Sequence, residues 1–169
     1  MMYVRYVLLV LLSLFADLLN LFLAPLVVLF APKDGWLPRW LWWFQTPDNS
    51  LDGDKGWKVQ VKPGYASRVR WLWRNSMYGF AISVLGVKIL PTDRILTVGS
   101  PKVSNRPLYE GLVKRYLYRD GKCVAFQWYY VKAWSGTRCI RLNFGWKLWG
   151  DNPTGQLVHG PSFTMGYSK

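Results

Sequence analysis

The first thirty residues of the chain are almost uniformly apolar. Between residues 6 and 31, 22 of 26 positions are apolar, and the exceptions are Ser13, Asp17, Asn20 and Pro25. A helix of that length extends ~39 Å, which exceeds the ~30 Å thickness of a bilayer's hydrocarbon core. The pattern therefore predicts a transmembrane anchor over residues 1–32. A cleaved signal peptide is the alternative, but its apolar region is shorter, and the proline after Ala31 disfavours cleavage.

Four small or polar residues form a stripe along this predicted helix. Ser13, Asp17, Asn20 and Ala24 are spaced by four, three and four residues, so they share one helix face. Such stripes mediate helix pairing in lipid. We expect them to dock a second copy of the chain or another membrane protein. The alternative is a protonated aspartate tolerated within a lone span.

A tryptophan-rich segment follows the apolar stretch directly. Residues 36–44 read WLPRWLWWF, and residues 33–56 continue into an acidic, turn-rich loop. Tryptophan is enriched at the membrane–water boundary, because its ring is apolar and its N–H stays hydrated. We expect Trp36, Arg39, Trp40, Trp42 and Trp43 to lie at the membrane interface, with a buried aromatic cluster as the alternative.

The rest of the chain, residues 57–169, reads as a basic and mainly β domain. Asp120-Gly121 and Ser135-Gly136 are hairpin signals that delimit strands at 111–119, 122–134 and 137–149. The predicted fold class is α+β: one N-terminal transmembrane helix, then a mainly antiparallel domain containing a three-stranded meander at 111–149. Residues 81–90 fit either a strand or a short interfacial helix.

Pairing Arg119 with Lys122 and Trp134 with Thr137 assigns the two faces of that meander. The expected core face carries Leu112, Tyr116, Ala125, Tyr129 and Val131 opposite Ile140, Leu142, Phe144, Trp146 and Leu148. The other face carries aromatic residues and no acid; its basic members are Arg115, Arg119, Lys122, Lys132, Arg141 and Lys147. In this register Cys123 and Cys139 lie ~30 Å apart, too far for a disulfide.

The net positive charge of the chain indicates an anionic binding partner. The chain has 22 basic and 9 acidic residues, and its net charge of +13 falls entirely outside residues 1–32. Arg68, Arg70 and Arg74 also surround two tryptophans. Because an anchored domain already lies beside lipid, we expect these residues and the basic face to bind anionic lipid. Nucleic acid is the weaker alternative. The positive-inside rule and two free thiols favour a cytoplasmic location for the domain.

Chemistry at a metal or catalytic centre has little support in the sequence. Asp48, Ser50, Asp52 and Asp54 match the first half of a calcium loop, but Val59 stands where the bidentate glutamate belongs. An Asx-rich turn explains the same residues. The chain has one histidine, His159, and no nucleophile or phosphate-loop motif. The sequence therefore predicts no catalytic residue and no cofactor beyond this calcium alternative.

Several blocks of this sequence resemble the sequences of one group of proteins. The blocks are LPRWLWWFQTPDN at 37–49, LDGD at 51–54, WLWRN at 71–75, YGF at 78–80 and GWKL at 145–148. They are similar to uncharacterised small membrane proteins of tailed-phage and prophage genomes. The resemblance implies a viral origin and a place in the host envelope, and it carries over no catalytic residue. We expect a factor acting at the host inner membrane, for example in superinfection exclusion or envelope modification. The alternatives are a virion or genome-delivery component and a membrane-tethered nucleic-acid-binding module.

Overall fold

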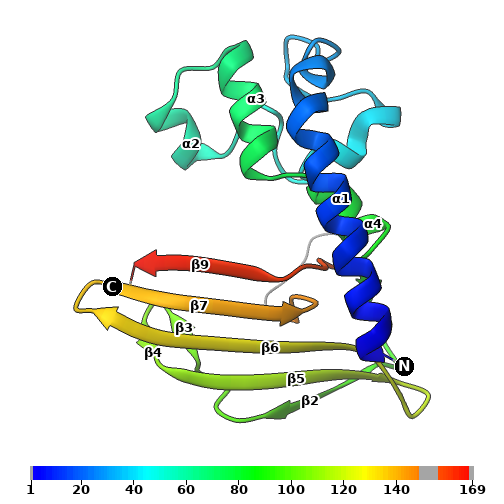
Figure 1. The fold of residues 1–169 in the computed structure, drawn as a ribbon, viewed down its shortest axis with the longest axis vertical. Coiled ribbons are helices and arrows are strands. Elements are labelled where there is room, and N and C mark those ends of the chain that lie inside the picture. Colours follow the sequence, from blue (N-terminus) through cyan, green and yellow to red (C-terminus); the bar gives the residue numbers. More distant parts are fainter. Residues whose placement is uncertain (1, 149–155, 168–169) are drawn as a thin grey trace. The chain divides into compact units, whose positions relative to one another are not determined.

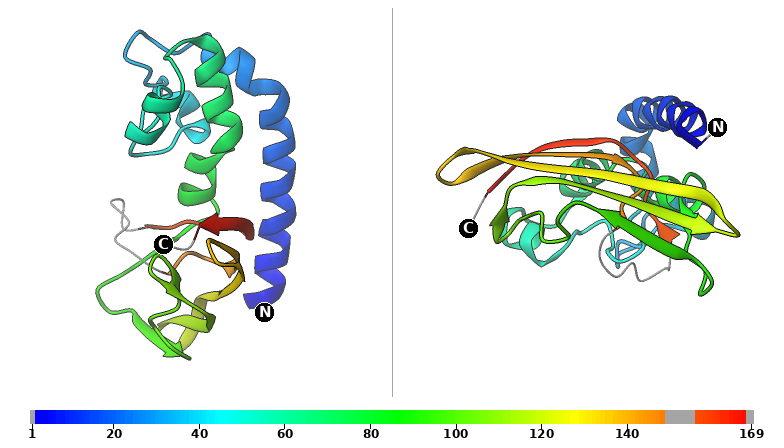
Figure 2. Two further views of the ribbon diagram at one scale, coloured as in Figure 1. Left: turned by 90° about the vertical axis from the view of Figure 1, so that its left-hand side faces the viewer. Right: turned by 90° about the horizontal axis from the view of Figure 1, so that it is seen from below.

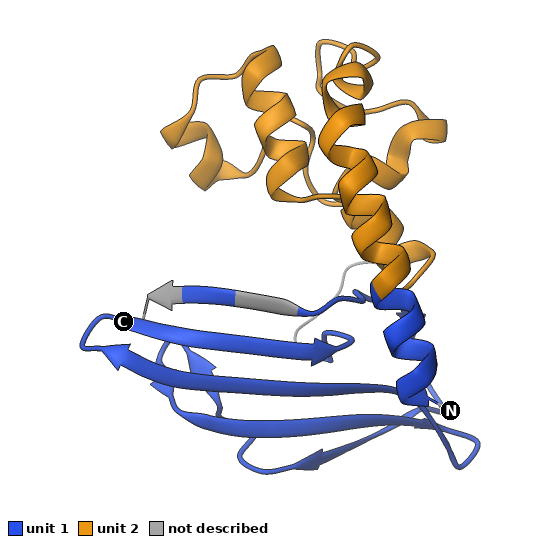
Figure 3. Cartoon of the chain, viewed as in Figure 1, with its two compact units in different colours: residues 1–10, 86–169 blue, residues 11–85 orange. Residues whose placement is uncertain are grey.

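The computed structural model describes residues 2–148 and 156–167. An N-terminal apolar helix is followed by a mainly antiparallel sheet domain, which confirms the predicted α+β class (Figure 1). The chain divides into two compact units (Figure 3). Unit 1 comprises residues 1–10 and 86–169, and unit 2 comprises residues 11–85.

Helix α1 runs from Met2 to Val28 and contributes residues to both units. Its leucine-rich sequence favours a helix, and Pro25 is accommodated within it. The backbone N–H groups of residues 29–31 bond to carbonyls three residues earlier, so the helix ends in a tightened turn. Among the described residues, α1 is the one helix long and apolar enough to cross a membrane.

Unit 2 is built from short helices around the second half of α1. They are η1 (Arg39–Phe44), α2 (Lys55–Gln60), α3 (Tyr65–Arg74) and α4 (Tyr78–Ser83). Their shared core contains Ala24, Val27, Val28, Leu41, Leu51, Val69, Trp71 and Leu72. The structural division therefore differs from the expected domain limit at residue 57, since residues 57–85 are largely helical and belong to unit 2. Residues 81–90, for which a strand and a short helix were the two alternatives, contain part of each. Helix α4 ends at Ser83, and strand β1 (Val87–Lys88) follows.

Unit 1 contains a five-stranded antiparallel sheet of order β2-β5-β6-β7-β9. Its strands are β2 (Arg94–Val98), β5 (Gly111–Arg119), β6 (Lys122–Ser135), β7 (Arg138–Gly145) and β9 (Ser162–Tyr167). Figure 2 shows how the strands of this sheet twist. The two hairpins of the predicted meander are confirmed, and residue 149, the end of the expected third strand, lies outside the described residues. Two short pairs complete the unit: β1 with β8 (Gln156–Leu157), and β3 (Ser104–Asn105) with β4 (Leu108–Tyr109).

The predicted register is wrong by one residue along most of the meander. Arg119 does pair with Lys122, but β6 contains an extra residue at Val124, so Leu117 pairs with Ala125. A second irregularity at Trp134 makes Ala133 pair with Cys139. A shift of one residue moves the side chains of a strand to the opposite face. The expected core face therefore combined residues from both sides of the sheet.

The two sides of the sheet are covered differently. The core side carries the fully buried Val113, Leu117, Ala125, Val131 and Cys139, and Val103 packs against it. The helix side carries Phe126, Trp128 and Tyr130, and Tyr3 and Tyr6 of α1 contact its aromatic rings. Cys123 lies at the start of β6 and pairs with Tyr118, whereas Cys139 lies on β7 and pairs with Ala133 near the other end of β6; both are free thiols.

Candidate membrane-binding surface

Within unit 2, α1 has one covered face and one exposed apolar face. The covered residues are Ala16, Asn20, Ala24, Val27 and Val28. The exposed ones are Leu11, Leu12, Leu14, Phe15, Leu18, Leu19, Leu21, Phe22, Leu23 and Leu26, with Phe22 69% exposed. Soluble domains rarely expose an apolar patch of this extent, so the outward face of α1 is the first part of a candidate membrane-binding surface.

The covered face includes two of the four stripe residues. Asn20 Nδ2 donates hydrogen bonds to the Leu72 carbonyl and to Ser76 Oγ, both at 3.0 Å. Ala24 is fully buried in the core of unit 2. These contacts belong to α3 and the turn after it, which run alongside this part of α1 (Figure 2, left). Two residues expected to dock a second chain are thus occupied by their own chain.

The remaining stripe residues keep part of their surface accessible. Ser13 and Asp17 are half-buried. A cavity of about 270 Å³ lies beside the stripe, lined by Asp17, Leu18, Asn20, Leu21, Trp73 and Ser76. Trp73 is held at this cavity because its Nε1 donates to the Leu21 carbonyl at 3.1 Å.

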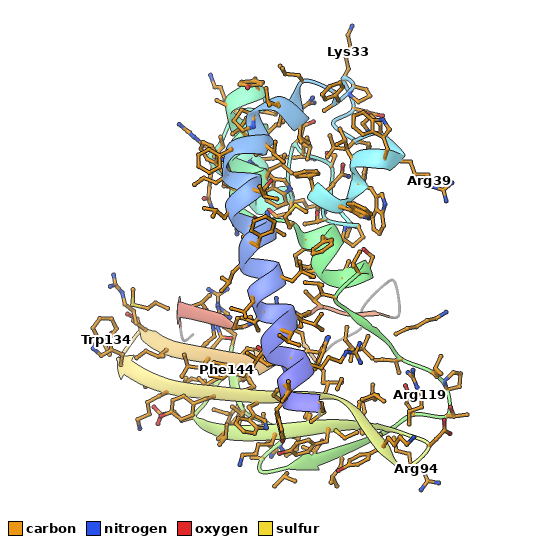
Figure 4. All side chains as sticks on the ribbon, turned by 45° about the vertical axis from the view of Figure 1, so that its right-hand side comes forward. Lys33, Arg39, Arg94, Arg119, Trp134 and Phe144 are labelled. Carbon is orange, nitrogen blue, oxygen red and sulfur yellow. The ribbon has the colours of Figure 1, made fainter. Side chains whose placement is uncertain are left out.

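The tryptophan-rich segment forms the second part of the candidate surface. Trp36, Trp40, Trp42 and Trp43 are all exposed, and Trp40 is the most exposed at 65%. Its ring lies 5.3 Å from that of Phe30, just beyond the end of α1. The segment thus returns to the C-terminal end of the apolar helix, where an aromatic belt belongs. Lys33 and Arg39 point away from the body of unit 2 (Figure 4).

Close backbone packing and one buried amide hold this segment in place. Gly79 of α4 faces the carbonyls of Trp42 and Gln45; a methyl group there would lie 2.4 Å and 2.7 Å from the two oxygens. Gln45 is buried; its Oε1 accepts from the Leu37 N–H at 2.8 Å, and its Nε2 donates to the Asn49 carbonyl at 3.2 Å. The exposed tryptophans are therefore presented by a fixed frame.

The three arginines expected to bind lipid from α3 have separate roles. Arg68 forms a bidentate ion pair with Asp52 and donates to the carbonyls of Pro32 and Lys33. Arg74 lies over the rings of Trp57 and Trp71, at 5.4 and 5.6 Å from their centroids. Arg70 is exposed. Arg68 therefore holds the fold, whereas Arg70 and Arg74 are both exposed to solvent.

The six basic residues of the meander do not share one acid-free face, which corrects the expectation. Arg115 and Arg141 lie on the core side, because the irregularities in β6 shift β5 and β7 by one residue. Lys132 lies on the helix side, and its Nζ is 2.7 Å from Glu110 Oε2. Arg119 forms a bidentate ion pair with Asp93, lowering the pKa of that carboxyl to about 2.

The other two basic residues of the meander lie in two further environments. Lys122 is exposed at the β5–β6 turn, and Lys147 is half-buried near Arg141. A planar acid-free surface for lipid is therefore absent from this part of the described sheet.

The calcium-like loop is a structural turn. Asp54 caps α2, because its carboxylate accepts from the Trp57 N–H at 2.7 Å. Asp52 is engaged by Arg68, and the Asp52 N–H donates to Ser50 Oγ at 3.4 Å. Asp48 is exposed. Over the described residues, no three His, Cys, Asp or Glu side chains are grouped so as to hold a metal.

His159 has a structural position that the sequence did not indicate. The residue is buried, and its ring lies 5.0 Å from that of Tyr6 and 5.4 Å from that of Trp146. Desolvation lowers the pKa of His159 to about 4. Its partners come from residues 6 and 146, and no local pattern in a Gly/Pro-rich segment connects positions so far apart.

The fold and this surface define an α+β protein with an exposed apolar N-terminal helix. A comparison with protein-family models matches residues 1–166 to a "Family of unknown function (DUF7338)", and the chain belongs to that family. Searches of curated proteins and of solved structures found no match.

Proposed function

We propose that this chain is a phage-encoded protein that acts at the host inner membrane, by excluding a later infection or by modifying an envelope complex. The observation that carries the proposal is the exposed apolar face of α1 together with the four exposed tryptophans near its C-terminal end. The resemblance of the sequence blocks to phage membrane proteins supports the viral origin. The net charge of +13 supports contact with an anionic leaflet.

The contacts of α1 favour an anchor that lies along one leaflet over the single span expected from the sequence. Residues 2–10 pack within unit 1, where Tyr6 is part of the core. Residues 20–28 pack against α3 within unit 2. Between them lie nine residues, 11–19, that extend about 14 Å, roughly half of the ~30 Å hydrocarbon core.

The connectivity of the chain supports the same arrangement. A spanning α1 places residues 2–10 and residues 29–85 on opposite sides of the membrane. Unit 1 requires residues 2–10 together with residues 86–169, so the chain would have to cross again near residue 86. The described residues contain no second helix suited to a crossing. A leaflet-bound α1 keeps every described contact of both units.

Membrane attachment is tested with one matched pair of variants. Phe22→Asp places a charge on the outward face of α1, and Val59→Asp places the same charge on α2 at a side chain that is 88% exposed. We expect the wild-type chain and Val59→Asp to sediment with the inner membrane and resist alkaline carbonate, and Phe22→Asp to be released. If wild-type protein is recovered in the soluble fraction without detergent, the proposal fails.

The orientation of the anchor is tested with epitope tags at both ends of the full-length chain. In inverted inner-membrane vesicles, protease removes both tags when α1 lies in the cytoplasmic leaflet. Protection of the N-terminal tag alone identifies a spanning helix and overturns the leaflet-bound arrangement, while leaving the membrane function in place.

The biological role is tested by expressing the chain alone in a susceptible host. A reduced plating efficiency of a second phage, lost in Phe22→Asp and kept in Val59→Asp, supports superinfection exclusion. Stoichiometric copies in purified particles would instead assign the chain to the virion.

A further inference from the structure

A cavity of about 340 Å³ opens on the core side of the sheet in unit 1. Strands β5, β6 and β7 contribute Arg115, Tyr129 and Arg141 to its lining. The segment that leads into the β3–β4 hairpin supplies the other lining residues, which are Pro101, Val103, Ser104 and Asn105. Two guanidinium groups therefore line one polar cavity of unit 1.

The side-chain hydrogen bonds that these two arginines donate go to neutral groups. Arg115 Nη1 donates to Gln127 Oε1 at 3.0 Å, and Arg141 Nη1 donates to Asn105 Oδ1 at 3.3 Å. Neither guanidinium forms an ion pair with a carboxylate within residues 2–148 and 156–167. Arg68 and Arg119, by contrast, each form a bidentate pair with an aspartate. The cavity thus concentrates positive charge that this part of the chain does not neutralise.

One donor of an arginine that lines the cavity has no acceptor. Arg141 Nε is buried and makes no hydrogen bond within the described part of the chain. Leaving a buried N–H of a charged group without an acceptor is costly, so the side chain of Arg141, which lines the cavity, has hydrogen-bonding capacity that the described chain does not use. Burial raises the pKa of the Tyr129 phenol, which keeps this lining hydroxyl neutral and able to donate.

The charge is held in place by the sheet. Gln127 is fully buried, and its Nε2 donates to Asn143 Oδ1 at 2.8 Å, which fixes the amide that receives Arg115. Burial lowers the pKa of the nearby Lys147, and so does the positive charge of Arg141. Arginines fixed on β5 and β7, the two strands that flank β6, form a preorganised site, which loses little side-chain freedom when an anion binds.

We propose that Arg115, Arg141 and Tyr129 bind a phosphate-type oxyanion in this cavity. The planar fork of arginine matches the oxygens of a phosphate, and two such forks supply more donors than a halide uses. The phosphate can be part of a lipid headgroup or be free inorganic phosphate, and both present the same oxygens. This inference goes beyond the proposed function and does not depend on how α1 meets the membrane.

The site is tested with the full-length protein in non-ionic detergent micelles. Inorganic phosphate and glycerol 1-phosphate are titrated by calorimetry at constant ionic strength, with chloride as the reference anion. We expect saturable binding that weakens about tenfold or more in Arg141→Gln and in Arg115→Gln. Arg94→Gln, which removes the same charge from an exposed position on β2, should bind as the wild type does.

Further measurements keep the result interpretable. Arg141→Lys keeps the charge and loses the fork, so it should bind with intermediate affinity. Matching circular dichroism and thermal unfolding of all variants show that the fold is intact. Tighter binding of glycerol 1-phosphate supports a lipid headgroup, and tighter binding of inorganic phosphate supports a free anion. No binding of either probe, or equal binding by wild type and a folded Arg141→Gln, overturns the proposal.

Discussion

The ring of Tyr6 lies 5.5 Å from the ring of Trp146, so a side chain of the apolar N-terminal helix forms part of the core of a unit whose sheet is made from residues 94–167. Tyr6 also contacts Phe126 and His159. The first turns of α1 therefore belong to unit 1 as much as any strand does.

Removing this ring should destabilise unit 1. We expect Tyr6→Ala to lower its free energy of unfolding by roughly 3 kcal/mol, because a large buried ring leaves a cavity among three aromatic side chains. Hydrogen exchange at β6 and β7 measures the effect. Tyr3→Ala is the control, since Tyr3 is exposed; an equal loss of protection in both variants would contradict a special role for Tyr6.

The contact between α4 and η1 should be sensitive to one methyl group. Gly79→Ala places its Cβ against the Trp42 carbonyl, and overpacking of this kind costs about 2 kcal/mol. Gly136→Ala should leave stability almost unchanged, because nothing lies within 4 Å of the added carbon. Thermal unfolding and tryptophan fluorescence in micelles compare the two, and equal melting temperatures would show that η1 yields to the methyl group.

The single histidine should make the stability of unit 1 depend on pH. The pKa of His159 is about 4 in the folded chain, against an ordinary value of 6.5. Between these values the unfolded state binds more protons, so the contribution of His159 to the free energy of unfolding should fall as the pH drops from 6.5 to about 4 and level off below that. His159→Phe should flatten this part of the profile. The Asp93 carboxyl titrates separately, since its pKa is about 2.

Arg68 should be far less replaceable than Arg70. Arg68→Lys loses the bidentate pair with Asp52 and at least one bond to the carbonyls of Pro32 and Lys33, which should cost about 2 kcal/mol in unit 2. Arg70→Lys keeps an exposed charge and should unfold like the wild type. Limited proteolysis after residue 33 provides a local readout. Unchanged cleavage in Arg68→Lys would show that a lysine suffices.

The sequence predicted the positions of the helix α1 and the hairpins better than it predicted the side of the sheet on which each side chain lies. An apolar run marks α1, and the turn dipeptides at 120–121 and 135–136 place the hairpins β5–β6 and β6–β7 within a residue or two. The extra residues Val124 and Trp134 have no local signature, because a β-bulge depends on how a strand pairs with its neighbours. As a result, the expected basic face was wrong.

Only part of the candidate site could be predicted, because the rest depends on contacts between residues that are far apart in the sequence. Exposed tryptophans follow α1 as the composition indicates, although their membrane role remains a prediction. The stripe of α1 pointed to a partner helix, but a stripe cannot show that α3 of the same chain supplies the cover for Asn20 and Ala24. Likewise Arg115 and Arg141 are 26 residues apart, and the sheet alone brings them to one cavity.

The position of Tyr6 in the core has a consequence for the order of events during translation. The ribosome makes Tyr6 first and its partner Trp146 another 140 residues later. At ~5–20 residues per second, that interval lasts roughly 7–28 s. Throughout that interval the nascent apolar helix has no sheet to pack on, so its apolar side chains are exposed for as long as the sheet is missing.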